Sequence, residues 1–385
     1  MTAKPTRGSA GTGSSGLRHM VQLDGLRALA ILAVFVSHFG GSHSLFARLL
    51  PWGTLGVRLF FVLSGFLITG ILLQCREYRD QGLETSRSVL RSFYVRRFLR
   101  IFPIYYATVL AVTLVNIRPM RDAIGWNLTY TSNFYWAVHD YQGTGSHFWS
   151  LAVEEQFYLI WPWLIFCVPR HRLLAVNLLL IVSGVGFRGL GMIFGWNDFA
   201  LQILPLGCLD TLGIGSLAAI LTQGGRVGSA KSCRWVRISL WSGLLLMVFR
   251  AFAGGFAWGR RLWVVLDVSG MELVFGPLVV YAAKGFRGVG GRILAARPLV
   301  YIGKISYGMY VYHGFMPAVC QHAFKLAGLS VFYWRFDGWL NSAISITLAA
   351  ASWHFFESPI NRLKERFRYT PVPGLKANAV LAPGR

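Results

Sequence analysis

The chain alternates between long apolar segments and short charged ones. Apolar segments of roughly twenty residues, the length that crosses a bilayer core, recur about ten times. They lie at residues 24–41, 55–74, 101–117, 149–168, 173–193, 201–221, 238–256, 263–283, 299–323 and 339–357. Such segments are too long for barrel strands, and lipid admits only helices and closed barrels. The pattern therefore predicts an all-α fold: a polytopic transmembrane helical bundle over residues 20–363, with tails at 1–19 and 364–385.

The positively charged residues predict how this bundle is oriented. An even number of spans puts both termini on one side, and the loops and tails on that side carry 26 Lys and Arg residues against 7 on the other. Because short cytoplasmic loops are enriched in Lys and Arg, we expect both termini in the cytoplasm. Residues 1–19 are polar and rich in Gly and Ser, so we expect a disordered tail there.

Composition narrows the class of protein further. A hydrophobic content of 54% is above that of ordinary soluble domains. A net charge of +23 would suit a nucleic-acid partner, but the basic residues flank the apolar segments as in membrane proteins, so none is expected. The five cysteines have no paired or metal-like spacing, which predicts neither disulfides nor a metal site.

The first apolar segment carries two ionisable residues on one face. Arg27 and His38 are eleven positions apart, which is about three helical turns and roughly 16 Å along the axis. Ionisable residues inside a membrane helix are costly and mark candidate functional sites. Asp24 lies three residues before Arg27 and can pair with it. For His38, an interhelical hydrogen bond without chemistry is an equally good interpretation of this helix alone.

The segment FYVRRFLRIFP carries a second basic pair at the cytoplasmic end of the third span. Arg97 and Arg100 are spaced i,i+3, so their guanidinium groups can grip one phosphate together. Taken alone, this pair is better explained as a cytoplasmic flank that binds anionic lipid.

The segment FWSLAVEEQFYLIWP opens the fourth span and introduces carboxylates into an apolar helix. Glu154 and Glu155 lie there, one turn after Ser150. A carboxylate beside His38 would orient the imidazole and raise its basicity, as in a general base. The presence of one of the two carboxylates is equally explained if that side chain lies at the hydrated membrane interface. The aromatic residues of this segment predict an interfacial belt: Trp149, Phe157, Tyr158 and Trp161.

Two further spans carry polar residues that can line a cavity or bind an acceptor. Ser64 lies in the second span, where Arg58 near the outer end is expected to snorkel to the interface. Tyr310 and His313 lie one turn apart in the ninth span, and we interpret them as cavity lining rather than a second catalytic base.

Taken together, these segments resemble the membrane-bound acyltransferase family 3, which includes bacterial O-acetyltransferases of polysaccharides, nodulation factors and macrolides. The resemblance runs from about residue 20 to 363, and the order of its motifs is specific although each is weak alone. The matching motifs are LDGLRALAILAVFVSH, GVRLFFVLSGFLI, FYVRRFLRIFPIYY, FWSLAVEEQFYLIWP, ISYGMYVYH and FFESP.

The resemblance implies ten membrane helices in a bacterial inner membrane and an acyl-CoA donor, most often acetyl-CoA, that enters from the cytoplasm. It implies that His38 is catalytic and that Arg27 pairs with it as the family's Arg-x(10)-His motif. Arg97 and Arg100 match the donor-side Arg-x-x-Arg motif, and Glu154 or Glu155 matches the acidic position. No permanently bound cofactor is implied. The acceptor would be a hydroxyl of a glycan, a lipid-linked saccharide or a small molecule.

Some family members carry an additional C-terminal hydrolase-like domain that completes transfer. This sequence does not contain one, so we expect the bundle or a separate partner to complete it. The main alternative is a transporter or flippase without chemistry, in which Arg27 and His38 line a polar path. The absence of a visible internal repeat argues against that alternative. A purely structural subunit would leave the buried ionisable residues unexplained. The oligomeric state does not follow from the sequence.

Overall fold

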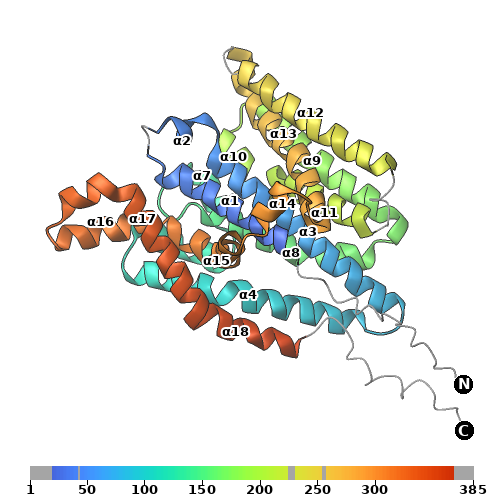
Figure 1. Cartoon of the computed structure of the whole chain (residues 1–385), viewed down its shortest axis with the longest axis horizontal. Helices are drawn as coiled ribbons and strands as arrows, with labels where there is room; N and C mark the ends of the chain where they lie inside the picture. Colours follow the sequence, from blue (N-terminus) through green and yellow to red (C-terminus); the bar gives the residue numbers. More distant parts are fainter. Residues whose placement is uncertain (1–19, 42–43, 224–229, 254–256, 368–385) are drawn as a thin grey trace, which may run out of the picture.

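A computed structural model describes residues 20–41, 44–223, 230–253 and 257–367, and no strand occurs among them. The all-α prediction is confirmed for this part of the chain (Figure 1). The long helices overlap the predicted apolar segments: α1 (Val21–Phe39), α3 (Trp52–Asp80), α4 (Ser86–Leu114), α8 (Phe148–Cys167), α9 (Leu173–Ile193), α11 (Leu209–Gln223), α12 (Ala230–Ala253), α13 (Ala257–Lys284), α15 (Arg297–His313) and α17 (Ser330–Ser352).

Six stretches of the described residues are long and apolar enough to cross a membrane. They are Val21–Phe39, Trp52–Asp80, Ser86–Leu114, Arg170–Ile193, Pro205–Gln223 and Val265–Lys284. The protein is therefore a multi-pass membrane protein, while the predicted number of ten spans and the cytoplasmic placement of the termini stay predictions. The predicted tails lie outside the described residues, except for 364–367.

Short helices connect and flank the long ones. They are α2 (Leu45–Leu49), α5 (Arg118–Asp122), α6 (Ile124–Leu128), α7 (Ser132–His139), η1 (Arg170–Arg172), α10 (Asp198–Ile203), η2 (Pro205–Cys208), α14 (Val289–Leu294), α16 (Met316–Leu326), η3 (Trp353–Glu357), α18 (Ser358–Arg362) and η4 (Leu363–Arg366).

The bundle is built around α1, which packs against both α3 and α15, while α3 packs against α11 (Figure 1). Glycines allow the closest of these contacts. A Cβ on Gly65 of α3 would overlap the Leu212 carbonyl of α11, and one on Gly215 of α11 would overlap the Val62 carbonyl of α3. Small residues of this kind let membrane helices approach closely. Close packing is needed because no hydrophobic effect drives helices together within lipid. Helices α12 and α13 form a hairpin at one edge of the bundle.

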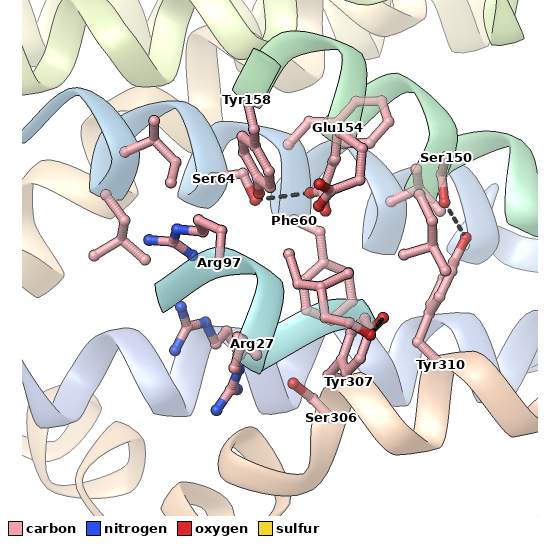
Figure 2. Close-up of a pocket in the computed structure, with 18 residues that line it drawn as sticks. Arg27, Phe60, Ser64, Arg97, Ser150, Glu154, Tyr158, Ser306, Tyr307 and Tyr310 are labelled. Atoms are coloured by element: carbon pink, nitrogen blue, oxygen red, sulfur yellow. Dashed lines mark hydrogen bonds between the residues drawn. The ribbon is translucent and has the colours of Figure 1, made fainter. Parts of the chain in front are cut away.

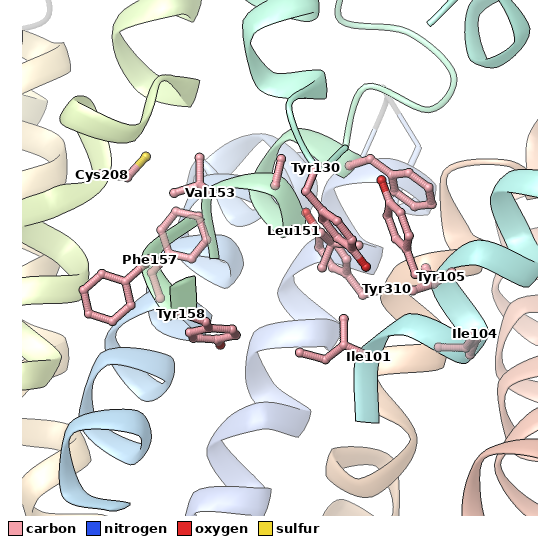
Figure 3. Packing of buried hydrophobic residues seen from close by; sticks show 14 of the residues in the cluster. Ile101, Ile104, Tyr105, Tyr130, Leu151, Val153, Phe157, Tyr158, Cys208 and Tyr310 are labelled. Carbon is pink, nitrogen blue, oxygen red and sulfur yellow. The ribbon is translucent and has the colours of Figure 1, made fainter. Parts of the chain in front are cut away.

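Aromatic side chains fill the interior around α8 (Figure 3). Tyr105 of α4 stacks on Tyr130 with ring centroids 4.2 Å apart, and Phe157 stacks on Trp161 at 5.3 Å. Phe157, Tyr158 and Trp161 are all buried. The predicted interfacial belt is therefore wrong for these three residues, because their side chains pack into the protein instead of facing the lipid interface.

Two predicted spans are interrupted in the structure. The segment 299–323 breaks after His313, where α15 ends, and Pro317 lies in the first turn of the new helix α16. The segment 201–221 breaks near Pro205, which begins the short helix η2. Proline fits the first turn of a helix, where its missing N–H has no intrahelical partner in any case. The predicted segment 238–256 ends with residues 254–256, which lie outside the described residues.

Candidate active site

A narrow cavity of about 110 Å³ lies between α1, α3, α4, α8 and α15, and we call it the arginine cavity. Arg27, Arg97 and Arg100 line it, so the structure brings the three arginines of the predicted donor site together (Figure 2). Its further polar lining consists of Ser64, Ser150, Glu154, Glu155, Tyr158, Ser306, Tyr307 and Tyr310. A cluster of guanidinium groups in such a space is suited to hold a phosphorylated ligand.

The surroundings of the three arginines hold their charged groups in place. Arg27 donates to Asp24 at 3.0 Å, which confirms the predicted pair. The Arg97 guanidinium lies 5.6 Å from the centre of the Tyr158 ring, and that of Arg100 lies 5.5 Å from the Trp353 ring. Both distances are within the range of cation–π attraction.

Carboxylate and hydroxyl groups continue the lining of the cavity away from the arginines. The Ser64 hydroxyl donates to Glu154 Oε1 at 2.7 Å, and Glu155 lines the same space. Farther along, the hydroxyls of Ser150 and Tyr310 are hydrogen-bonded at 2.6 Å, and Tyr310 also donates to the His147 carbonyl at 3.2 Å (Figure 2).

A second cavity of about 520 Å³ lies beyond this hydrogen bond, and we call it the histidine cavity. His38, His147 and His313 line it. Its other lining residues are Val34, Ser37, Pro51, Gly53, Thr54, Val57, Arg58, Gln142, Ser146, Trp149, Asp198, Phe199, Gln202, Ile203 and Tyr310.

The two cavities adjoin at a shared boundary, which we call the junction. Val57 and Tyr310 line both of them, and the hydrogen bond between Ser150 and Tyr310 lies at this junction. The predicted donor residue Arg27 and the predicted catalytic residue His38 therefore belong to adjoining cavities, at opposite ends of α1. The arrangement allows a ligand held at the arginines to present a reactive end to a group in the histidine cavity.

The predicted contact between a carboxylate and His38 is wrong. Glu154 and Glu155 line the arginine cavity, and Glu154 bonds to Ser64. Among the described residues, no carboxylate makes a hydrogen bond or ion pair with His38. The ring contacts of His38 are with Phe39 and His313.

The predicted snorkelling of Arg58 is also wrong, because its side chain is only 1% exposed. It donates to the Thr211 hydroxyl at 3.1 Å and to the Gln202 carbonyl at 3.2 Å. The Thr211 hydroxyl in turn donates to Glu272. Arg58 is thus anchored inside the bundle next to the histidine cavity, not at the interface.

Sequence reasoning missed two sets of residues around the cavities. His147 lies in a loop between apolar segments, where a histidine gives no periodic signal. The buried pair of Arg188 and Asp210 was detectable only as isolated charges near or within apolar segments. In the structure, Asp210 accepts two hydrogen bonds from Arg188, one at 2.8 Å.

The short helix η4 adds an ionisable amine, that of Lys364, near the arginines of α4. Arg96 donates to the Lys364 carbonyl at 2.8 Å, which docks this turn on α4. Burial, and then the charges of Arg100, Arg97 and Arg96, lower the pKa of Lys364 to about 6, against a weaker opposing effect of Glu357. A lysine of this kind is largely neutral at pH 7 and gains a proton when an anion binds nearby.

These features define a helical membrane protein in which an arginine-lined cavity adjoins a larger histidine-bearing one. The chain belongs to the acyltransferase family 3, whose "Acyltransferase domain" matches residues 20–353. The resemblance stated from the motifs is thereby confirmed. No solved structure matches the chain.

Curated relatives give the comparison more detail. The chain is 27% identical over 384 residues to the peptidoglycan O-acetyltransferase OatA of Listeria monocytogenes, covering 90% of this chain and 56% of that protein. It is 28% identical over 395 residues to the O-acetyltransferase OatA of Staphylococcus aureus, covering 90% and 58%. A putative O-acetyltransferase of S. aureus is 29% identical, covering 92% and 60%. The chain thus spans less than two thirds of the length of these relatives.

Proposed function

We propose that this protein is an inner-membrane O-acyltransferase that moves an acetyl group from cytoplasmic acetyl-CoA to a hydroxyl of a glycan. The observation that carries the proposal is the junction of the two cavities at Tyr310. One cavity offers three arginines for an anionic donor, and the other offers His38 for an acceptor. The relatives named as O-acetyltransferases support the choice of acetyl and of oxygen as the acceptor atom.

The donor binds with its phosphates toward the arginines. Coenzyme A carries several negative charges at one end and a neutral thioester at the other. Arg97 and Arg100 hold phosphate oxygens, and the excess of basic residues in the loops on this side supports a cytoplasmic location of this end. The neutral arm extends through the narrow cavity and brings the thioester to Ser150 and Tyr310. When the donor is bound, one of these two hydroxyl groups exchanges its bond to the His147 carbonyl or to the other hydroxyl for a hydrogen bond to the thioester oxygen as that oxygen becomes negatively charged.

The transfer step needs a base on the other side of the junction. The acceptor hydroxyl lies in the histidine cavity and gives its proton to His38 as its oxygen attacks the thioester carbonyl carbon. The carbon–sulfur bond breaks, an ester forms, and the coenzyme A thiolate leaves and is later protonated. An acyl-histidine intermediate at His38 is an alternative route to the same products.

The histidine cavity has the size and lining that a sugar acceptor requires. It is the larger of the two cavities, at about 520 Å³. Gln142 and Asp198 offer hydrogen-bonding groups, and Trp149 and Phe199 offer aromatic surface. Polar groups for the hydroxyls of a sugar and aromatic surface for its apolar faces are thus present in the same cavity. The relative named as a peptidoglycan O-acetyltransferase makes a cell-wall glycan the first acceptor to test.

The experiment uses the full chain in lipid nanodiscs, with acetyl-CoA binding and slow acetyl-CoA hydrolysis as readouts. Arg97→Ala/Arg100→Ala is expected to abolish binding. His38→Ala is expected to keep binding and lose hydrolysis by a factor on the order of 100 to 10,000. The matched control is Arg87→Ala/Arg91→Ala, an exposed pair on the same helix outside the arginine cavity.

Two results would overturn the proposal. If the folded parent protein does not bind acetyl-CoA and its folded variants do not either, then the donor assignment fails and the transporter interpretation is preferred. If the control pair abolishes binding as strongly as Arg97→Ala/Arg100→Ala, the binding reflects the general positive charge of this surface rather than the cavity.

A further inference from the structure

Three imidazole rings form a row beside the histidine cavity. His38 at the end of α1 and His313 at the end of α15 have ring centroids 4.8 Å apart. His147, which precedes α8, continues the row at 4.7 Å from His313. Gly314 permits this approach, since a Cβ there would overlap the His147 ring. The middle ring therefore belongs to His313, and its neighbours on both sides are imidazoles.

The hydrogen bonds of His313 determine which of its nitrogens carries the proton. Its Nδ1 lies 2.7 Å from the Tyr310 carbonyl oxygen, and a carbonyl can only accept. Nδ1 is therefore the N–H, and Nε2 keeps its lone pair in the neutral ring. His313 is 0% exposed, and its Nε2 has no hydrogen-bond partner among the described residues. A buried acceptor without a partner is costly and calls for an explanation.

The spacing of the two rings suits a hydrogen bond between them. Each ring nitrogen lies about 1.1 Å from the ring centre, and an N–H···N bond adds about 2.9 Å, so bonded imidazoles have centroids about 5 Å apart. The observed 4.8 Å between His38 and His313 is close to that value. The His38 side chain is exposed, so rotation of its ring can direct an N–H at the lone pair of His313.

We propose that His313 is a positioning residue for His38: its Nε2 accepts a hydrogen bond from one nitrogen of His38 and thereby leaves the other nitrogen unprotonated and facing the acceptor. This rests on the proposed function, in which His38 is the base. The role is the one that a carboxylate or carbonyl plays for many catalytic histidines, namely fixing the tautomer and the orientation of the ring. When His38 takes the acceptor proton, its hydrogen bond to His313 persists and becomes charge-assisted.

Two amides of different length at position 313 test this proposal. His313→Asn keeps an amide N–H near the place of Nδ1, where it can donate to the Tyr310 carbonyl, but it does not reach the place of Nε2. His313→Gln reaches that place with its amide oxygen and restores an acceptor for His38. His139, an exposed histidine on α7, supplies the control His139→Asn.

The readouts are acetyl-CoA binding and the rate constant of acetyl-CoA hydrolysis by the full chain in nanodiscs. We expect His313→Asn to bind acetyl-CoA normally and to lose turnover about 100-fold, since a histidine base in the wrong tautomer is ineffective. His313→Gln is expected to recover at least a tenth of the parent rate. The double variant His38→Ala/His313→Asn should be no slower than His38→Ala, because one residue acts through the other.

The outcomes separate this proposal from the proposed function. If His38→Ala retains turnover, the proposed function itself fails. If His38→Ala is inactive but His313→Asn turns over at the parent rate, only the positioning role is overturned. If the losses of the two single variants multiply in the double variant, or if His313→Gln is no better than His313→Asn, then His313 acts independently of His38 and the proposal is wrong.

Discussion

The buried pair of Arg188 and Asp210 offers the sharpest test of the stability of the bundle. Both side chains are 0% exposed, and they join α9 to α11. Asp210 accepts two hydrogen bonds from Arg188 and one from the Thr211 backbone N–H at 2.9 Å. Arg58 and Glu272 reach the same network through the hydroxyl of Thr211.

Substituting Asp210 by Ala removes the partner of Arg188 without relieving the cost of burying the Arg188 charge. A buried charge left without its partner typically costs 3–5 kcal/mol, so we expect Asp210→Ala to be destabilised by about 4 kcal/mol. The double variant Arg188→Met/Asp210→Leu removes both charges and fills much of the space. It should recover most of the loss, because replacing both partners by apolar groups is often neutral or stabilising.

The assay is reversible unfolding of the purified protein in mixed detergent micelles, followed by tryptophan fluorescence. Acetyl-CoA binding at a fixed temperature serves as an independent measure of the folded fraction. The reasoning is refuted if Asp210→Ala loses less than about 1 kcal/mol, the range of an exposed ion pair. It is equally refuted if the double variant is as unstable as Asp210→Ala.

Three further predictions concern packing, the junction and the donor end. Gly65→Val should destabilise the fold by more than about 3 kcal/mol in the same unfolding assay, because the valine side chain would overlap a carbonyl of α11. An effect under about 1 kcal/mol would contradict the close contact of α3 and α11. Tyr310→Phe removes the hydrogen bond to Ser150 and should lower the rate of acetyl-CoA turnover about 10-fold while acetyl-CoA binding is unchanged. A loss of binding as large as the loss of turnover would contradict this role of Tyr310. Because its pKa is about 6, Lys364 should take up a proton when acetyl-CoA binds at pH 7, so affinity should fall as pH rises from 6 to 8. Calorimetry in buffers of different ionisation enthalpy measures that uptake, and Lys364→Arg, which is already charged, should abolish the part due to this residue.

Sequence reasoning works well where the geometry is contained in one helix. The i,i+3 spacing of Arg97 and Arg100 puts both in the arginine cavity, and the pairing of Asp24 with Arg27 follows from the same spacing. Arg27 and His38 lie on one helix, so their separation along the axis was also predictable. Helical geometry is the same in any context, which is why these relations survive folding.

Sequence reasoning fails where the position of one helix relative to another has to be known. Glu154 and His38 were expected to meet, but the Glu154 carboxylate bonds to Ser64 of α3 instead. Arg58 was expected at the interface, yet the close approach of α3 and α11 places it beside Thr211. The relative rotation and depth of two helices depend on packing between side chains far apart in the sequence, and the hydrophobic pattern carries no such register.

The arrangement of charge along the cavities supports a division of labour within the proposed function. The cations that line the arginine cavity are Arg27, Arg97 and Arg100, whereas the junction contains Val57 and Tyr310. If the phosphates of coenzyme A moved past Val57 and Tyr310, the phosphates would lose both water and counterions, at a prohibitive electrostatic cost. A neutral thioester has no such penalty and fits a narrow passage. Within the proposed function, the bundle would hold the charged end of the donor still while only the acyl group crosses the junction, which would explain why His38 belongs in one cavity and Arg27, Arg97 and Arg100 in the other.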